Sequence, residues 1–153
     1  EVPSKLMMVG EGPEKENAEY LCEQLGIQNK VIFFGNSNEI DRILCFSDLF
    51  LLPSQTESFG LAALEAMASS VPVISSNSGG LSEVNKDGFS GYLSTVGNVS
   101  EMTEKALQIL KNDDSLNQFK LNAKAQSLNF DIHAIVPKYE SIYQKTLSKC
   151  LVK

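Results

Sequence analysis

The chain of 153 residues has no tryptophan, one histidine, one arginine and only three cysteines. Cys22, Cys45 and Cys150 form no C-x-x-C pair, which argues against a disulfide framework and a zinc site. We therefore expect reduced thiols, as in a cytoplasmic protein, with Cys22 and Cys45 packed inertly on helix faces. His133 stands beside Asp131 near an expected helix start, and no catalytic triad or metal cluster can be assembled around it.

Positive charge and long apolar runs are scarce as well. Lys and Arg number 13 against 19 Asp and Glu, which leaves a net charge of −6. Nucleic acids and anionic membrane surfaces are bound through basic stripes, so neither is an expected partner. No run approaches the roughly 18 apolar residues of a membrane-spanning helix. The chain starts with Glu1 and shows no signal-peptide pattern, so we expect a fragment of a longer protein.

The remaining composition, 42% hydrophobic and 21% charged residues, is that of a globular protein, and the length suits a single domain over residues 1–153. Short apolar runs predict strands at residues 5–9, 31–34, 49–52, 73–75 and 91–93. Helical patterns fall at residues 14–25, 39–46, 60–69, 101–110, 116–128 and 136–148, with Ser100 as a cap. The alternation predicts an α/β fold, a three-layer parallel sheet with helices on both faces, followed by an all-helical C-terminal end.

The last helix carries an apolar stripe at helical spacing, formed by Val136, Tyr139, Ile142, Tyr143 and Leu147. The simpler interpretation is that this stripe packs on its own domain. Pro137 is tolerated in a first helical turn but not deeper, so we expect residues 130–135 to form a separate turn or short helix.

Two glutamates flank the strongest candidate site. Glu57 follows the buried apolar run 49–52, and Glu65 stands on the next helix, which begins at Gly60. A strand that feeds a helix through such a loop presents free backbone N–H groups at the carboxyl edge of the sheet, where an anion is favoured. The residues around Glu65 are small and apolar, so we expect its carboxylate to need a partner.

Glu57 and Glu65, with seven residues between them, resemble the E-x7-E motif of glycosyltransferase family 4. This family groups retaining, nucleotide-sugar-dependent enzymes of two-domain, Rossmann-like architecture. Further blocks resemble the family in its own order, at residues 9–14 (VGEGPE), 31–35 (VIFFG), 71–74 (VPVI), 79–84 (GGLSEV) and 88–93 (GFSGYL). Several weak blocks in sequence are a much stronger signal than any one of them.

The resemblance implies that the chain is the donor-binding half of a retaining hexosyltransferase, without its first strand-helix unit and its N-terminal acceptor domain, and inactive alone. A hexose such as N-acetylglucosamine would pass from a UDP-sugar to an acceptor hydroxyl. We expect no cofactor, and no metal ion because the sequence offers no D-x-D-like carboxylate pair. Glu57 would be the catalytic residue at the hexose, and Glu65 would bind the ribose. The implied donor-binding residues are Glu57, Ser58, Phe59, Gly60, Leu61, Glu65, Gly35, Asn36, Gly10 and Gly12. The C-terminal helix would reach the N-terminal domain.

Other interpretations stay open. A Rossmann domain of another class, such as a dehydrogenase, is one rival. Gly10 and Gly12 could begin its dinucleotide fingerprint, but the match is poor because Lys15 stands where the third glycine is needed. A non-catalytic interaction module is a second rival. No Lys or Arg lies between Arg42 and Lys86. Since a helix N-terminus carries only about half a positive charge, the cations that would neutralise a diphosphate must come from elsewhere.

Overall fold

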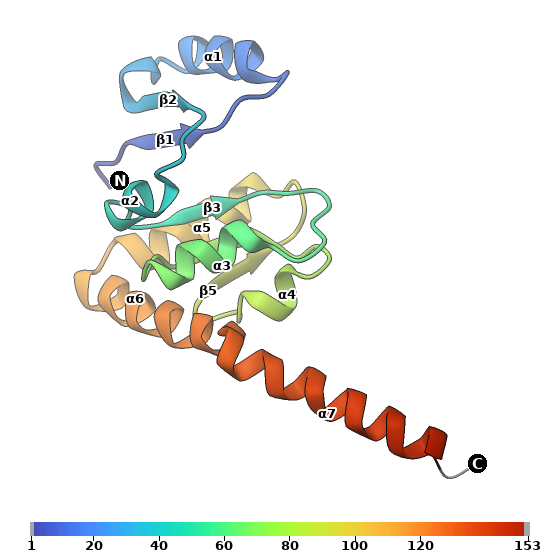
Figure 1. Cartoon of the computed structure of the whole chain (residues 1–153). Helices are drawn as coiled ribbons and strands as arrows, with labels where there is room; N and C mark the ends of the chain where they lie inside the picture. The colour runs from blue at the N-terminus through green and yellow to red at the C-terminus, as the bar shows by residue number, and fades with distance from the viewer. Residues whose placement is uncertain (1, 152–153) are drawn as a thin grey trace. The chain divides into compact units, whose positions relative to one another are not determined.

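The computed structural model describes residues 2–151, and the chain divides between Ile43 and Leu44 into two compact units. The single domain expected over residues 1–153 stays a prediction. The first unit contains β1 (Leu6–Val9), α1 (Lys15–Gln24), a 3₁₀ turn (Gln28–Lys30) and β2 (Val31–Gly35). β1 and β2 are parallel (Figure 1), as expected for strands joined by a crossover helix. Every side chain of β1 is apolar and exposed.

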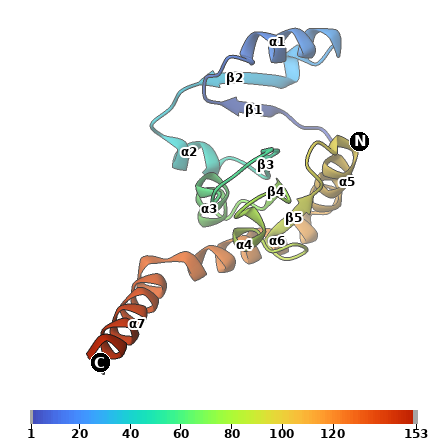
Figure 2. The same ribbon diagram turned by 90° about the vertical axis from the view of Figure 1, so that its right-hand side faces the viewer.

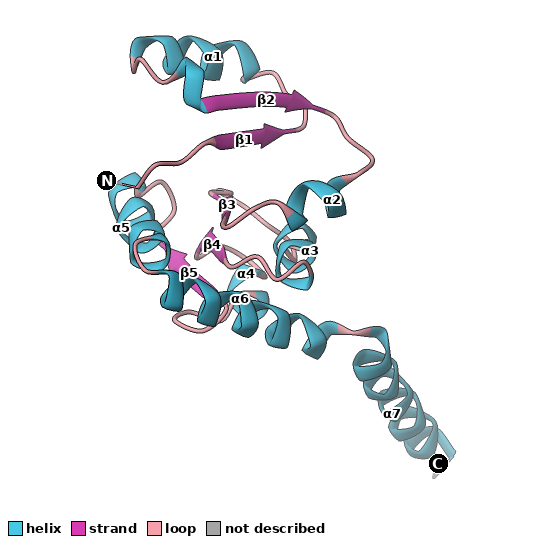
Figure 3. Ribbon diagram, turned by 90° about the vertical axis from the view of Figure 1, so that its left-hand side faces the viewer, coloured by secondary structure: helices cyan, strands magenta, loops and turns pink. Residues whose placement is uncertain are grey.

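The second unit is built on a parallel sheet in the order β3-β4-β5, and α2 (Ile40–Cys45) contains the boundary between the units. The strands are β3 (Phe50–Leu52), β4 (Val73–Ser76) and β5 (Gly91–Ser94). The helices are α3 (Leu61–Ala68), α4 (Leu81–Val84), α5 (Val99–Leu110), α6 (Asp113–Ser127) and α7 (Ile132–Leu151), with a 3₁₀ turn η2 (Leu128–Phe130) before α7. Figures 2 and 3 show α3 and α4 on one face of the sheet and α5 on the opposite face. The predicted α/β class is confirmed.

The core of the second unit surrounds β4, whose four residues are all buried. α3 turns one face inward, where Ala63, Ala66 and Met67 are fully buried. This spacing is that of one side of a helix, so the opposite side of α3 remains exposed. The central strand and the buried face of α3 thereby fix the position of the loop that precedes α3.

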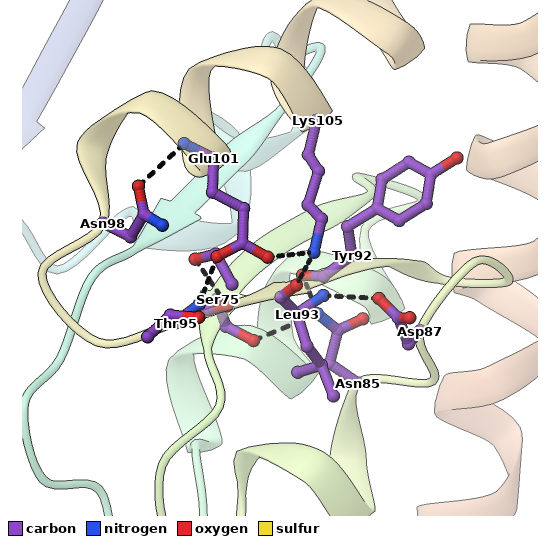
Figure 4. Close-up of polar contacts among 10 residues, drawn as sticks. Ser75, Asn85, Asp87, Tyr92, Leu93, Thr95, Asn98, Glu101 and Lys105 are labelled. Carbon is purple, nitrogen blue, oxygen red and sulfur yellow. Dashed lines mark hydrogen bonds and ion pairs between the residues drawn. The ribbon is translucent and has the colours of Figure 1, made fainter.

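A buried asparagine joins α4 to the two strands beside it. The Nδ2 atom of Asn85 donates to the carbonyl oxygens of Val73 and Tyr92 at 3.1 and 3.0 Å and to Oγ of Ser75 at 3.1 Å. Its Oδ1 accepts from Oγ of Ser90 at 2.9 Å. Buried polar groups need such partners, and here they lock the end of α4 to β4 and β5 (Figure 4).

An ion pair within α5, between Glu101 and Lys105, hydrogen-bonds to the backbone at the end of β5 (Figure 4). Nζ of Lys105 lies 2.7 Å from a carboxylate oxygen of Glu101 and also donates to the carbonyl of Leu93. The backbone N–H of Thr95 donates to the other carboxylate oxygen at 2.8 Å. The bonds from Lys105 and Thr95 lower the pKa of Glu101 from 4.5 to about 2. The cap of α5 is Asn98, which accepts from the N–H of Glu101, and not the expected Ser100.

The C-terminal helices differ most from expectation. α6 begins at Asp113 because Asn112 caps it with bonds to the N–H groups of Asp114 and Ser115. α7 begins at Ile132, so Pro137 lies inside the helix and not in its first turn.

The apolar stripe does not pack on its own domain. Val136, Tyr139, Ile142, Tyr143 and Leu147 are 43–63% exposed, so that interpretation is wrong. The cysteine expectation also fails in part, since Cys45 is exposed and Cys22 only half-buried. The side chain of Cys150 lies outside the described residues. Among the helices within residues 2–151, none combines the length and apolar character needed to cross a membrane.

The lowered pKa of Glu101 predicts a pH-dependent contribution to stability. Because the folded pKa lies below the ordinary value, the contribution is present above about pH 4.5 and is lost as the pH falls towards 2. Glu101→Gln should therefore lower the melting temperature near neutral pH and have little effect near pH 2. Thermal unfolding across this range measures the difference, with Glu104→Gln on the exposed side of the same helix as control. An equal loss at both ends of the range would contradict the assignment.

Candidate functional site

The loop of residues 53–60, called the Glu57 loop, connects the carboxyl end of β3 to α3. Gly60 ends it with φ of 97°, a left-handed conformation that suits glycine. A Cβ atom at Gly60 would also lie 2.6 Å from Cδ2 of Leu81, so a side chain there would strain the backbone and force the buried Leu81 side chain to shift. The sharp turn directs the chain from the sheet edge straight into the helix.

The Glu57 loop lies directly against the turn after β4. Oγ of Ser78 donates to the carbonyl oxygen of Gln55 at 2.8 Å, and the N–H of Gly80 donates to that of Glu57 at 3.2 Å. A Cβ atom at Gly79 would overlap the carbonyl oxygen of Glu57, and one at Gly80 would lie 2.6 Å from that of Ser58. Two backbones therefore touch without side chains between them. Gly79 and Gly80 thus allow a close approach between two segments of the protein's own backbone.

The N-terminus of α3 faces the end of this loop without a side-chain cap. The first amide recorded as donating within the helix is that of Leu64, which bonds to the carbonyl of Gly60 at 3.1 Å. The N–H groups of residues 61–63 precede it, as the first amides of a helix always do. Together with the positive end of the helix dipole, these amides favour an anion.

The two glutamates differ in exposure. Glu57 is half-buried in the loop, whereas Glu65 lies on the exposed side of α3, together with Leu61 and Ala62. Among residues 2–151, neither carboxylate has a recorded hydrogen bond or ion pair within the protein. Because Glu65 is exposed, its carboxylate is not enclosed by the apolar residues around it in the sequence, and the partner expected for it stays a prediction. The roles of Glu57 and Glu65 in donor binding stay predictions.

The other predicted site residues lie in the first unit. The structure brings Gly10 and Gly35 together at the carboxyl ends of β1 and β2, where the N–H of Gly10 donates to the carbonyl of Gly35 at 2.8 Å. Both glycines have positive φ. Gly12 and Asn36 are exposed beside them. Lys15, which replaces the third glycine of a dinucleotide fingerprint, instead pairs with Glu11 at 3.1 Å.

Sequence reasoning did not identify three residues that hold the Glu57 loop. Two of them, Ser78 and Leu81, flank Gly79 and Gly80. The glycine pair is the sequence feature that could have directed attention to them. The third is Phe130, whose ring contacts that of Phe59 with centroids 6.0 Å apart. No local pattern marks a contact between residues so distant in the chain. In the described part of the chain no group of three or more His, Cys, Asp or Glu side chains is arranged to hold a metal ion.

Residues 2–126 match the family model described as glycosyl transferases group 1. The chain is 40% identical over 149 residues to N-acetyl-alpha-D-glucosaminyl L-malate synthase of Bacillus anthracis, which covers 96% of the chain and 39% of that protein. It is 30% identical over 142 residues to 2-deoxystreptamine N-acetyl-D-glucosaminyltransferase of Niallia circulans, covering 91% of the chain and 36% of that enzyme. The chain thus spans less than half the length of these relatives.

Solved structures also match nearly the whole of this chain with less than half of their own length. The HepE protein of Anabaena in complex with UDP matches 93% of the chain and 41% of its own length, with a TM-score of 0.83 and 26% identity. TarM matches 91% of the chain and 28% of its own length, with a TM-score of 0.82 and 27% identity.

The contact between the two loops predicts that Gly79→Ala is far more damaging than Gly88→Ala. Both glycines have positive φ, 53° and 69°, so both alanines carry backbone strain. A Cβ at Gly79 also overlaps the Glu57 carbonyl, whereas one at Gly88 meets nothing within 4 Å. We expect Gly79→Ala to cost about 2 kcal/mol or more beyond Gly88→Ala in chemical denaturation. Equal losses in the two variants would show that the loops do not touch.

Proposed function

Because the chain belongs to the family of group 1 glycosyl transferases, we propose that it is the donor-binding domain of a retaining glycosyltransferase. The observation that carries the proposal is the position of the Glu57 loop. Its backbone packs against Gly79 and Gly80, and it leads into the N-terminus of α3, which has no side-chain cap. A nucleoside diphosphate sugar presents an anionic diphosphate between two polyhydroxylated rings. The free amides at the N-terminus of α3 can bind the diphosphate. The carboxylates of Glu57, before the helix, and Glu65, within it, can bind the hydroxyls of the two rings.

The proposed roles follow from chemistry. A carboxylate accepts hydrogen bonds from two neighbouring hydroxyls, and bonds to a charged acceptor are the stronger ones. Glu57 would hold the hexose, and the exposed Glu65 would hold the ribose. The backbone N–H groups of Phe59, Gly60 and Leu61 would meet the diphosphate. Ser58 lies in the same loop and is proposed to contact the donor there. For Gly10, Gly12, Gly35 and Asn36 of the first unit, donor binding stays a prediction from the family resemblance.

The donor is proposed to be UDP-N-acetylglucosamine. Two relatives, at 40% and 30% identity, are named for the N-acetylglucosaminyl group. HepE is described in complexes with UDP and with UDP-glucose, and it shares the fold of this chain. These names support a UDP-sugar, and the shared N-acetylglucosaminyl group favours that sugar over glucose.

The rest of the enzyme is proposed to lie outside the chain, which spans 39% of its Bacillus anthracis relative. The missing parts would include an acceptor-binding domain, a first strand-helix unit beside β1, and the Lys and Arg that neutralise the diphosphate. The exposed apolar side chains of β1 support a covering element there. With these cations as neutralising groups, no metal ion and no cofactor is proposed. The unpaired cysteines favour a cytoplasmic location.

Retention would follow from the leaving diphosphate acting as the base. The bond between the sugar C1 and the diphosphate oxygen breaks through an oxocarbenium-like state, and the acceptor oxygen bonds to C1 on the same face. The acceptor proton passes to the departing diphosphate. Glu57 would position the hexose and stabilise its developing positive charge without forming a bond to it.

This proposal predicts separate effects for the two acids in the longer protein, assayed with UDP-N-acetylglucosamine and with L-malate, the acceptor suggested by the name of the Bacillus anthracis relative. Glu57→Gln should lower kcat roughly 10- to 100-fold, and Glu65→Gln should raise the donor KM by a similar factor, because each loses charged hydrogen bonds. Glu83→Gln, an exposed acid on α4, serves as control and should leave both constants unchanged. Unchanged turnover and donor KM in both glutamine variants would end the assignment.

A further inference from the structure

Phe59 is held from two directions. Its backbone lies against Gly80, since a Cβ there would come within 2.9 Å of the Cα of Phe59. Its ring forms a T-shaped pair with that of Phe130, with centroids 6.0 Å apart and ring planes at 75°. Edge-to-face packing at this distance is favourable for two aromatic rings. Phe59, which lies between Glu57 and the start of α3, is therefore held by the Gly79–Gly80 turn and by η2.

Phe130 is itself held in place from both sides along the chain. Before it, Nζ of Lys124 on α6 donates to the carbonyl of Ala68 at the end of α3, at 2.8 Å. After it, Oδ1 of Asp131 accepts from the N–H of His133 at 2.8 Å and so caps the first turn of α7. The ring thus stands at a fixed junction between α6 and α7, two helices that take no part in the donor site described above.

A groove beside Phe130 makes its ring contact with Phe59 important. Phe130 lines a groove of about 230 Å³ together with Leu64 and Ala68 of α3 and with Ser127 and Leu128. The ring is therefore packed incompletely by the side chains of α3. The ring of Phe59 packs against Phe130 in addition to these side chains. Because Phe59 belongs to the Glu57 loop, this contact links the loop directly to Phe130.

We propose that Phe130 is a positioning residue of the donor site, which acts through Phe59 to hold the Glu57 loop against the Gly79–Gly80 turn. The inference rests on the proposed function for the meaning of the loop, but the contact is independent of any ligand. Through Phe130, the segment that leads into α7 sets the conformation of the loop that would receive the sugar and diphosphate.

Amide hydrogen exchange in this chain tests the contact. The N–H of Gly80 bonds to the carbonyl of Glu57, so its protection reports whether the loop is docked, while the N–H of Asn85 bonds to the carbonyl of Leu81 and serves as reference. Phe130→Ala should raise the exchange rate of Gly80 relative to Asn85 roughly 2- to 10-fold, as expected for loss of one aromatic pair. Phe130→Tyr keeps the ring and should behave as the unaltered chain.

A matched control removes a different ring pair, the one between α6 and β5. Phe119 contacts Tyr92 with centroids 5.3 Å apart, away from the Glu57 loop. Phe119→Ala should lower overall stability without changing the ratio of the two exchange rates. An unchanged ratio in Phe130→Ala, or an equal rise in Phe119→Ala, would overturn the inference.

A second readout separates the inference from the proposed function. In the longer protein, Phe130→Ala should raise the KM for UDP-N-acetylglucosamine roughly 2- to 10-fold, whereas Phe119→Ala should not. Faster exchange at Gly80 with no binding of this donor to the unaltered protein would leave the contact standing and refute the donor site. Donor binding that Phe130→Ala leaves unaltered, with unaltered exchange, would refute the role of Phe130 alone.

Discussion

The carbonyl of Glu57 lies against the backbone of Gly79 and Gly80 with no side chain between them. This contact joins the loop after β3 to the turn after β4, and it exists because the two strands are parallel neighbours whose carboxyl ends meet at one edge. Once the loop is held there, Gly60 can turn the chain at once into α3. The amides at the start of that helix then lie at the same edge as Glu57. A chain with bulkier residues at these positions would lose the arrangement.

The same arrangement explains how a chain with a net charge of −6 could bind an anionic substrate. Amides and a helix dipole attract a phosphate group without adding net charge, but they neutralise only part of a diphosphate. The stretch between Arg42 and Lys86 adds no cation. The proposed donor site therefore depends on basic groups beyond this loop, in keeping with a chain that spans 39% of its Bacillus anthracis relative.

Local patterns predicted the strands to within one or two residues, because buried apolar runs between turns have few alternative structures. They failed where a single polar side chain decides the outcome: Asn98 and Asn112 cap α5 and α6 earlier than the helical spacing suggested. The start of α7 was misplaced by relying on Pro137, although Asp131 caps the helix. In the candidate site, the acids and glycines could be identified, but the contact of Phe59 with Phe130 depends on tertiary packing that no local pattern encodes.

The most direct test is an NMR titration of the ¹⁵N-labelled longer protein, which would supply the missing cations, with UDP-N-acetylglucosamine and with free N-acetylglucosamine, which carries no diphosphate, as the comparison ligand. If the Glu57 loop receives the diphosphate, the amide signals of Phe59, Gly60 and Leu61 should shift with the UDP-sugar and not with free N-acetylglucosamine. Shifts confined to other parts of the chain, or the same response to both ligands, would contradict the account.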